Sequence, residues 1–279
     1  MLGSLFKREG KMPLRIVVGL NQVDKLIPDG WDERLNAPTE QAEEEIKRRS
    51  HDIVKKLEKF AHLSSSHIEY YSAKKRYRLM PLLVKIVQNA YAGFKLDNVQ
   101  PADPFELAED DVREFVKQER EKRKTIQQKT LKAEQLFSEL SKILSTDELN
   151  SIKQKFTEER QIPPKVAILG KAGVGKTTTV NSLFNAQYRT SHTIVGTTSA
   201  QMKEFALASG GTLNIVDLPG YGRSVAEDRE YEKVYQEMLP NCDLVLLVIQ
   251  ADSRDFADDQ EMLMKITEWL KQSPTPQRS

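Results

Sequence analysis

The residues that most clearly could carry out chemistry lie in one glycine-rich stretch, residues 170–177. This stretch has the pattern G-x-x-x-x-G-K-[ST]. Its glycines let backbone N–H groups curl around a phosphate, and a helix that starts there adds partial positive charge. Lys176 is expected to reach the β- and γ-phosphates, and the Thr177 hydroxyl to ligate Mg²⁺. A glycine turn without a ligand is the alternative. The predicted phosphate-binding residues are Gly170, Lys171, Ala172, Gly173, Val174, Gly175, Lys176, Thr177 and Thr178.

A second group of candidates lies further along the chain, where an apolar segment ends in Asp217-Leu-Pro-Gly220. The Asp217 carboxylate can hold Mg²⁺ through water, and the Gly220 N–H can face the γ-phosphate. The polar loop at residues 185–198 has the length to close over the metal, and Thr198 is preferred over Thr197 as its ligand. An ordinary solvated loop is the competing interpretation. The predicted metal ligands are Thr177, Thr198 and Asp217, and the predicted catalytic groups are Lys176, Thr198 and Gly220.

Two short polar motifs in the first third of the chain could read a base. Asn21-Gln22-Val-Asp24 and Ser72-Ala73-Lys74 each follow a short apolar run. The Asp24 carboxylate can accept from guanine N1 and N2 together, which adenine cannot match, and the Ala73 N–H can donate to guanine O6. Each motif is a weak signal alone, but the two at successive strand ends make a strong one. The predicted base-binding residues are Asn21, Gln22, Asp24, Ser72, Ala73 and Lys74.

The elements that must position these motifs alternate between apolar strands and amphipathic helices. Strands are predicted at residues 14–20, 67–71, 165–169, 201–208, 212–216 and 243–249, and helices at 39–63, from Pro81, 178–184, 227–238 and 256–270. Residues 93–104 are a predicted linker, and 105–144 a charged helical stretch. Ser145 and Glu148 form a capping box that starts another helix. The predicted units are residues 1–92, 93–164 and 165–279.

The motifs resemble those of the translation-factor-related GTPase superfamily, on its Era-like side, nearest to the YfjP-type GTPases and more distantly to the immunity-related GTPases. The likeness rests on residues 170–177, 217–222, 251–254 and 21–25, followed by Trp31. The family's motifs G1 to G5 occur here in the order G4-G5-G1-G2-G3. Gln22 stands where the family's G4 motif commonly has Lys.

The resemblance implies a circularly permuted P-loop GTPase fold of the α/β class. This fold has a mostly parallel six-stranded sheet with helices on both faces, and here an inserted helical segment. The family's sheet order is 2-3-1-4-5-6, so the N-terminal unit would supply strands 5 and 6 at one edge. Residues 1–13 and 273–279 would then lie close together. Whether such an order is natural, engineered or one half of a swapped pair stays open.

The resemblance further implies a GTP-binding protein that hydrolyses GTP to GDP and phosphate with Mg²⁺ and acts as a switch. Tyr221 stands where Ras-like enzymes have a water-positioning glutamine, so a slow intrinsic rate is expected. The missing group would come from a nucleotide-dependent homodimer, a protein effector or the switch loops. Potassium activation is not expected, because Gly173 stands where potassium-activated enzymes have Asn. The alternatives are a permuted ribosome-assembly GTPase and a GTP-binding scaffold with little turnover.

Composition limits the partners and the compartment. The net charge of +1 provides no global field for nucleic acid or membrane, so contact with nucleic acid or the ribosome has no compositional support. The helical segment is expected to pack as a helical hairpin against the rest of the domain, and the alternatives are a dimerisation or nucleotide-driven lever and an RNA or membrane contact at residues 118–124. The mixed charges of residues 118–124 favour a solvated helix face over that last contact. Cys242, the single cysteine, precedes an apolar run and is expected to be buried, in a cytoplasmic protein. No apolar run has the length of a membrane span.

Overall fold

A six-stranded sheet organises the molecule. The computed structural model describes residues 15–61, 63–90, 101–127, 141, 144–150, 164–184, 201–207, 211–222 and 224–273. The strand order is β4-β1-β8-β5-β7-β6, and only the β6–β7 pair is antiparallel among these neighbours. The strands are β1 (Ile16–Asn21), β4 (Ile68–Tyr70), β5 (Lys165–Leu169), β6 (Gln201–Leu207), β7 (Gly211–Asp217) and β8 (Leu244–Gln250). The predicted six-stranded, mostly parallel sheet is therefore confirmed.

The sheet joins the two ends of the chain. β1 runs parallel to β8 from Ile16 opposite Val245 to Asn21 opposite Gln250. β8 pairs with β5 on its other side, so the early strands β1 and β4 extend the sheet beyond β8. Because the carboxyl ends of parallel strands meet at one edge, the loops after β1, β4, β5 and β7 converge there.

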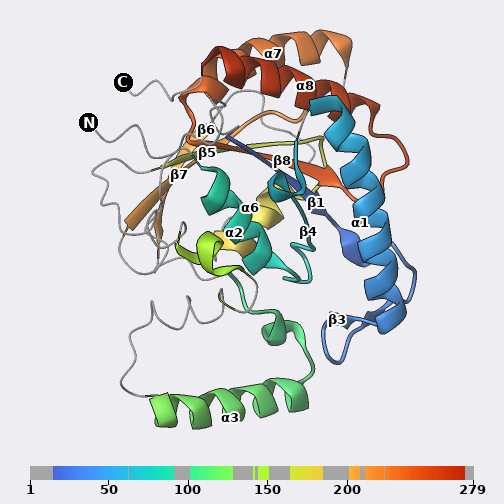
Figure 1. Cartoon of the computed structure of the whole chain (residues 1–279), viewed down its shortest axis with the longest axis vertical. Coiled ribbons are helices and arrows are strands. Elements are labelled where there is room, and N and C mark those ends of the chain that lie inside the picture. Colours follow the sequence, from blue (N-terminus) through green and yellow to red (C-terminus); the bar gives the residue numbers. More distant parts are fainter. Residues whose placement is uncertain are drawn as a thin grey trace.

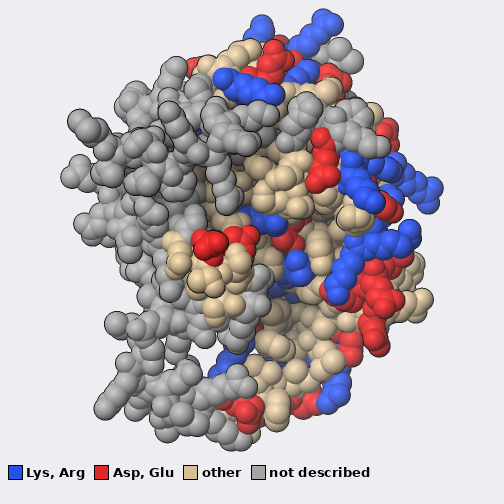
Figure 2. Space-filling model, in the orientation of Figure 1, with Lys and Arg blue, Asp and Glu red and all other residues tan. Residues whose placement is uncertain are grey.

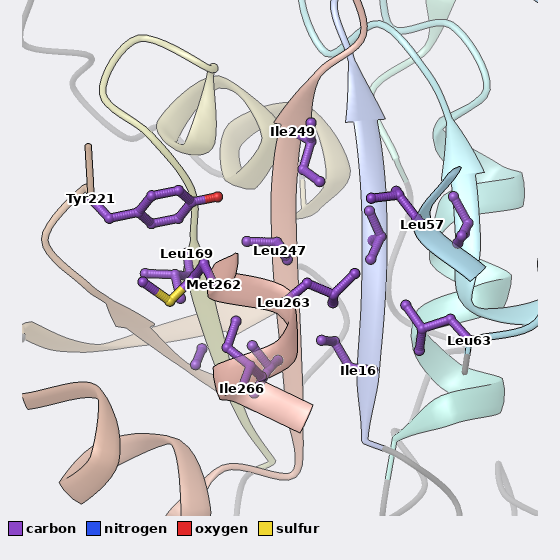
Figure 3. Close-up of a cluster of buried hydrophobic side chains, with 14 of the residues drawn as sticks. Ile16, Leu57, Leu63, Leu169, Tyr221, Leu247, Ile249, Met262, Leu263 and Ile266 are labelled. Carbon is purple, nitrogen blue, oxygen red and sulfur yellow. The ribbon is translucent and has the colours of Figure 1, made fainter. Parts of the chain in front are cut away.

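Helices cover both faces of the sheet (Figure 1). One buried cluster includes residues of α1 (Glu40–Ala61), α7 (Val225–Met238) and α8 (Ala257–Gln272). The opposite cluster includes residues of α2 (Leu79–Asn89) and α6 (Lys176–Phe184). In Figure 3, side chains of α8 such as Leu263 lie against Leu247 of β8 and Ile16 of β1. β8 is apolar along nearly its whole length because a central parallel strand is buried on both faces.

Outside this core lie a small hairpin and a projecting helix. β2 (Trp31–Asp32) and β3 (Ala37–Pro38) form a two-stranded antiparallel sheet, which sequence patterning did not predict, because two-residue strands show no alternation. The short 3-10 helix η3 (Pro104–Leu107) leads into α3 (Asp110–Gln127), which stands away from the sheet in Figure 1.

Most predicted elements agree with the observed ones, and the differences are local. α2 begins at Leu79, two residues before the expected start at Pro81. The charged stretch begins its α-helix at Asp110, and residues 128–140 lie outside the described residues. The capping box is confirmed: Ser145 N–H donates to Glu148 Oε2 at 3.0 Å, and Glu148 N–H donates to Ser145 Oγ at 3.4 Å.

The two described ends of the chain meet beside Cys242. The Arg15 guanidinium donates to the carbonyl of Ser273 at 2.5 Å and to the carbonyl of Cys242. Residues 1–13 and 274–279, whose closeness was predicted, lie outside the described residues. The Cys242 thiol is buried as expected, and burial raises its pKa to about 12. None of the described helices has the length and hydropathy of a membrane span.

Candidate nucleotide-binding site

The predicted site residues gather at the carboxyl edge of the sheet. Residues 170–175 form the loop between β5 and α6, and Lys176, Thr177 and Thr178 begin α6. Asp217 ends β7, and Asn21 ends β1. Two of these residues supply the oxygen donors that Mg²⁺ prefers, the Thr177 hydroxyl and the Asp217 carboxylate. Thr198 lies outside the described residues, so its role stays a prediction.

At two positions of the phosphate loop a Cβ would collide with a neighbouring strand. A Cβ on Gly170 would collide with the carbonyl oxygen of Val248 on β8. Gly175 has a φ of +91°, and a Cβ there would lie 2.5 Å from Asn21 Nδ2. The loop is thus packed tightly against neighbouring strands, and its shape follows from where the glycines stand.

Lys176 and Gly220 lie together over this loop. The Lys176 ammonium donates to the carbonyls of Gly170 at 2.8 Å and Lys171 at 3.0 Å. A Cβ built on Gly220 would be 3.2 Å from Lys176 Nζ and 3.1 Å from the Ala172 nitrogen. The predicted phosphate-binding lysine and the glycine after β7 therefore occupy one small region.

Asn21 connects the phosphate loop to the two N-terminal motifs. Its Nδ2 donates to the Val174 carbonyl at 2.8 Å, a residue 153 positions away in the sequence. Its Oδ1 accepts from the Ala73 N–H at 2.9 Å. Beside it, Gln22 Nε2 donates to the Gly173 carbonyl at 3.1 Å. Asn21 is 2% exposed, so its two bonds to Val174 and Ala73 are shielded from water.

The hydrogen-bond partner of the Ala73 N–H differs from the predicted one. The sequence predicts that it donates to a base, whereas in the structure it donates to Asn21. The Ala73 carbonyl accepts from Ser182 Oγ of α6 at 2.8 Å, and Ser72 Oγ accepts from the Lys75 N–H at 3.1 Å. Lys74 is exposed. The loop is therefore held from inside the protein, and Ala73 is fixed on two sides.

Asp24 has a buried oxygen without a donor. The residue lies in the short 3-10 helix η1 (Val23–Lys25), next to Asn21. Its Oδ1 is buried and has no hydrogen-bond partner among the described residues. An unsatisfied buried acceptor costs about 1–3 kcal/mol, so such atoms in native proteins call for an explanation. A ligand that donates hydrogen bonds would supply one.

Tyr221 stands at the position where a water-positioning glutamine would be expected. Its side chain is buried and bonds to a residue of α8. Its hydroxyl donates to Asp259 Oδ1 of α8 at 2.6 Å. Asp259 also pairs with Lys171 of the phosphate loop at 3.2 Å, and Asp258 pairs with Lys171 at 3.1 Å. Sequence reasoning missed Asp259, because two acids in the first turn of a helix look like ordinary dipole partners.

Burial dominates the electrostatics of this cluster. It raises the pKa of the Tyr221 hydroxyl well above its usual value, with the Asp259 charge adding to the effect. It also raises the pKa of Asp259, although the bonds from Tyr221 and Lys171 act in the opposite direction. For Lys171, burial lowers the pKa, but the nearby carboxylates outweigh it and the net shift is upward. The lysine ammonium is therefore the charged partner that makes this buried carboxylate tolerable.

Comparison with known proteins matches the part of the chain that contains the phosphate loop. Residues 165–276 match the family model described as 50S ribosome-binding GTPase. YfjP of Escherichia coli K12 is 34% identical over 116 residues, which are 41% of this chain and 40% of YfjP. The tRNA modification GTPase MnmE of Acholeplasma laidlawii is 30% identical over 130 residues, 44% of this chain and 28% of MnmE.

One solved structure, the G domain of the FeoB iron transporter of T. maritima, is 26% identical, with coverage of 41% of this chain and 69% of that chain and a TM-score of 0.27. The family match spans less than half of this chain, and the chain covers less than half the length of YfjP and MnmE. The match starts at the first residue of β5 and includes both Lys176 and Asp217.

Proposed function

We propose that this chain, whose residues 165–276 have the sequence of a P-loop GTPase, binds GTP with Mg²⁺ and hydrolyses it to GDP and phosphate as a nucleotide-dependent switch. The observation that carries the proposal is the position of Asn21. This buried side chain bonds to Val174 in the phosphate loop and to Ala73 in the second N-terminal motif. In this proposal a base-reading half and a phosphate-binding half would form one site.

The phosphate end of the site would work by positioning and charge neutralisation. Backbone N–H groups of residues 170–178 and the start of α6 would surround the phosphates. Lys176 would exchange its two carbonyl partners for β- and γ-phosphate oxygens. Thr177, Asp217 and Thr198 would hold Mg²⁺, which neutralises phosphate charge when it is bound. The Gly220 N–H would face the γ-phosphate.

Asp24 would determine the choice of base. Guanine offers two adjacent donors, N1–H and the 2-amino group, to a carboxylate that has a buried oxygen without a partner. Gln22 and Asn21 would border the base, and the loop at Ser72, Ala73 and Lys74 would close its far side. The Ala73 N–H already bonds to Asn21. We therefore propose that guanine O6 is contacted by this loop as a whole and not by the Ala73 N–H alone.

Hydrolysis by the isolated chain should be slow. The buried Tyr221 hydroxyl is bonded to Asp259 and is not available to orient an attacking water. The missing group would come from a second copy of the chain, a protein effector or the loop that contains Thr198. Such dependence on a partner suits a switch, because the partner then sets the lifetime of the triphosphate state.

The motif order also supports an Era-like, circularly permuted GTPase domain. In this proposal residues 1–92 are the base-reading half, 93–164 the inserted helical segment and 165–279 the phosphate-binding half. The contact between Arg15 and Ser273 lies where an unpermuted chain would run from α8 into β1. A cytoplasmic location belongs to the same proposal and is supported by the buried free thiol of Cys242.

A second candidate function is association with the large ribosomal subunit, which the description of the matching family model favours. On the face shown in Figure 2, however, basic and acidic side chains are interspersed among the described residues. Phosphate backbones attract clustered positive charge. Co-sedimentation with ribosomal subunits, with GTP and with GDP, tests this candidate; pelleting with 50S subunits in one nucleotide state would favour it over a free switch.

Binding of fluorescent GTP, ATP and XTP with Mg²⁺ to the wild type and to Asp24→Asn tests the proposed function. We expect the wild type to prefer GTP and the variant to shift toward XTP, because an amide matches the xanthine 2-oxygen and a carboxylate does not. The same nucleotide preference in the wild type and in Asp24→Asn would overturn the proposal that Asp24 recognises guanine. Phosphate release over many turnovers then separates a slow GTPase from a scaffold that binds GTP without turnover.

A further inference from the structure

The loop at residues 72–75, which contains Ser72, Ala73 and Lys74, is called the base-reading loop below. A buried asparagine outside the predicted motifs, Asn36, bonds to this loop and to two neighbouring segments. It stands between β2 and β3, is 4% exposed and has a left-handed backbone with a φ of 49°. Its Nδ2 donates to the Lys75 carbonyl at 2.9 Å and to the Pro104 carbonyl at 2.8 Å. Its Oδ1 accepts from Trp31 Nε1 at 3.2 Å.

These partners fix the orientation of the amide. Two carbonyl oxygens require the NH₂ group, and the Trp31 indole N–H requires the oxygen, so a flipped Asn36 would lose all three bonds. A buried amide whose two N–H donors and carbonyl oxygen are all bonded specifies one conformation of its neighbours. Asn36 therefore holds three segments together: the β2–β3 hairpin, the loop through Lys75, and the strap at residues 101–107.

The strap and the hairpin approach the base-reading loop from outside. The Ala102 N–H donates to the Ser182 carbonyl at 2.8 Å, and Ser182 Oγ donates to the Ala73 carbonyl. Lys75 Nζ lies 5.7 Å from the centre of the Trp31 ring and pairs with Glu33 of the hairpin at 2.5 Å. The loop is thus fixed at Ala73 by α6 and at Lys75 by Asn36.

We propose that Asn36 is a positioning residue for base recognition. It touches the loop from outside and sets the path of Lys74 and Lys75 relative to Asp24. The phosphate loop is held by its own contacts, to Val248 and Asn21. Loss of Asn36 should therefore weaken the hold on the base and leave the hold on the phosphates intact. This inference rests on the proposed function, because it assumes that the site binds a guanine nucleotide.

Two variants of Asn36 test the inference. Asn36→Gly removes the side chain at a position where glycine adopts the left-handed backbone without strain. Asn36→Asp keeps the size and the acceptor for Trp31 and loses both donors. The matched control is Asn89→Asp, because Nδ2 of Asn89, the last residue of α2, also donates to two carbonyls, those of Ser66 and Lys85. Should Asn36→Gly fail to fold, Asn36→Asp carries the test.

The measurements are the Kd for GDP, the Kd for tripolyphosphate with Mg²⁺ as a base-free probe, and the single-turnover rate with saturating GTP. For both Asn36 variants we expect a Kd for GDP that is about tenfold higher, which corresponds to about 1.4 kcal/mol. The Kd for tripolyphosphate and the single-turnover rate should stay within about twofold of wild type, a margin well below the tenfold step of 1.4 kcal/mol. Asn89→Asp should leave all three unchanged.

Two results would overturn the inference: an unchanged Kd for GDP in both Asn36 variants, or an equal loss for GDP and tripolyphosphate. The second result would mean that Asn36 supports the whole fold and not the base. A different pattern would show that the proposed function itself is wrong. In that case the wild type would lack a preference for GTP, or Asp24→Asn would not shift toward XTP. Either result is independent of the Asn36 variants.

Discussion

At the scale of single residues, the candidate site depends on buried side chains that bond to partners far away in the sequence. Asn21 bonds to the phosphate loop at Val174, and Asp24 lies three residues further along the chain, in η1. Asp259 and Asn36 carry no motif, because their partners lie far away in the sequence. Such supporting residues become visible only when the fold has brought distant segments together.

The bond between Tyr221 and Asp259 should matter for stability and not for the chemical step. Tyr221→Phe removes a buried hydrogen bond to a carboxylate, and such bonds contribute about 1.5–3 kcal/mol. We expect a lower free energy of unfolding by roughly this amount in urea titrations, since Asp259 keeps Lys171. The single-turnover rate of GTP hydrolysis should change less than about threefold, well under the tenfold that 1.36 kcal/mol in the barrier produces. A hundredfold fall in that rate would show that the phenol acts in catalysis.

His67 should make the stability depend on pH. Burial lowers its pKa from the usual 6.5, with the nearby charge of Lys85 acting in the same direction. The folded state therefore prefers the neutral imidazole, and the stabilisation is present above pH 6.5 and is lost as the pH falls below it. Thermal unfolding between pH 7.5 and 5 should show a smaller loss of Tm in His67→Gln than in wild type. Replacing the exposed His51 of α1 by Gln is the matched control substitution.

At the scale of elements, hydrophobic periodicity was enough to predict the strands and the long helices. The continuous apolar run of β8 and the spacing along α8 are strong signals. The hairpin of β2 and β3 is not predictable in this way, because its two-residue strands are defined by contacts such as that between Trp31 and Asn36. Its place next to the base-reading loop is a property of the fold.

The phosphate loop should respond very differently to alanine at two of its glycines. At Gly175 a Cβ would lie 2.5 Å from Asn21 Nδ2, so Gly175→Ala should disrupt the bond to Val174 and raise the Kd for GDP at least about a hundredfold, or 2.7 kcal/mol. At Gly173 a Cβ would meet nothing within 4 Å. We therefore expect Gly173→Ala to weaken GDP binding only by the backbone strain of its positive φ, about 1–2 kcal/mol. Isothermal titration with GDP compares the two variants. Equal losses would mean that packing against Asn21 does not shape the loop.

At the scale of the whole molecule, the sheet is the feature that the motifs predicted best. Asn21, Ser72 and Asp217 all stand at strand ends, and only a sheet that combines early and late strands brings them together. The observed order, with β1 between β4 and β8, agrees with the predicted position of the N-terminal strands at one edge. The path of α3 was not predictable, because its charged sequence defines a helix without defining where the helix packs.

A single sheet built from both ends of the chain should unfold as one cooperative unit. The chain has two tryptophans, Trp31 in β2 and Trp269 in α8, and each reports on one end of the sequence. In Trp31→Phe and Trp269→Phe the remaining tryptophan follows one end in urea, while far-UV circular dichroism follows the whole chain. We expect the fluorescence and dichroism midpoints to coincide in each variant, because β1 cannot leave the sheet without exposing β8. An early fluorescence transition of Trp31 that leaves the dichroism of the remaining sheet intact would show instead that the N-terminal strands are a separate domain. The proposed joint site would then lose its structural basis, since Asn21 and Val174 would belong to units that fold independently.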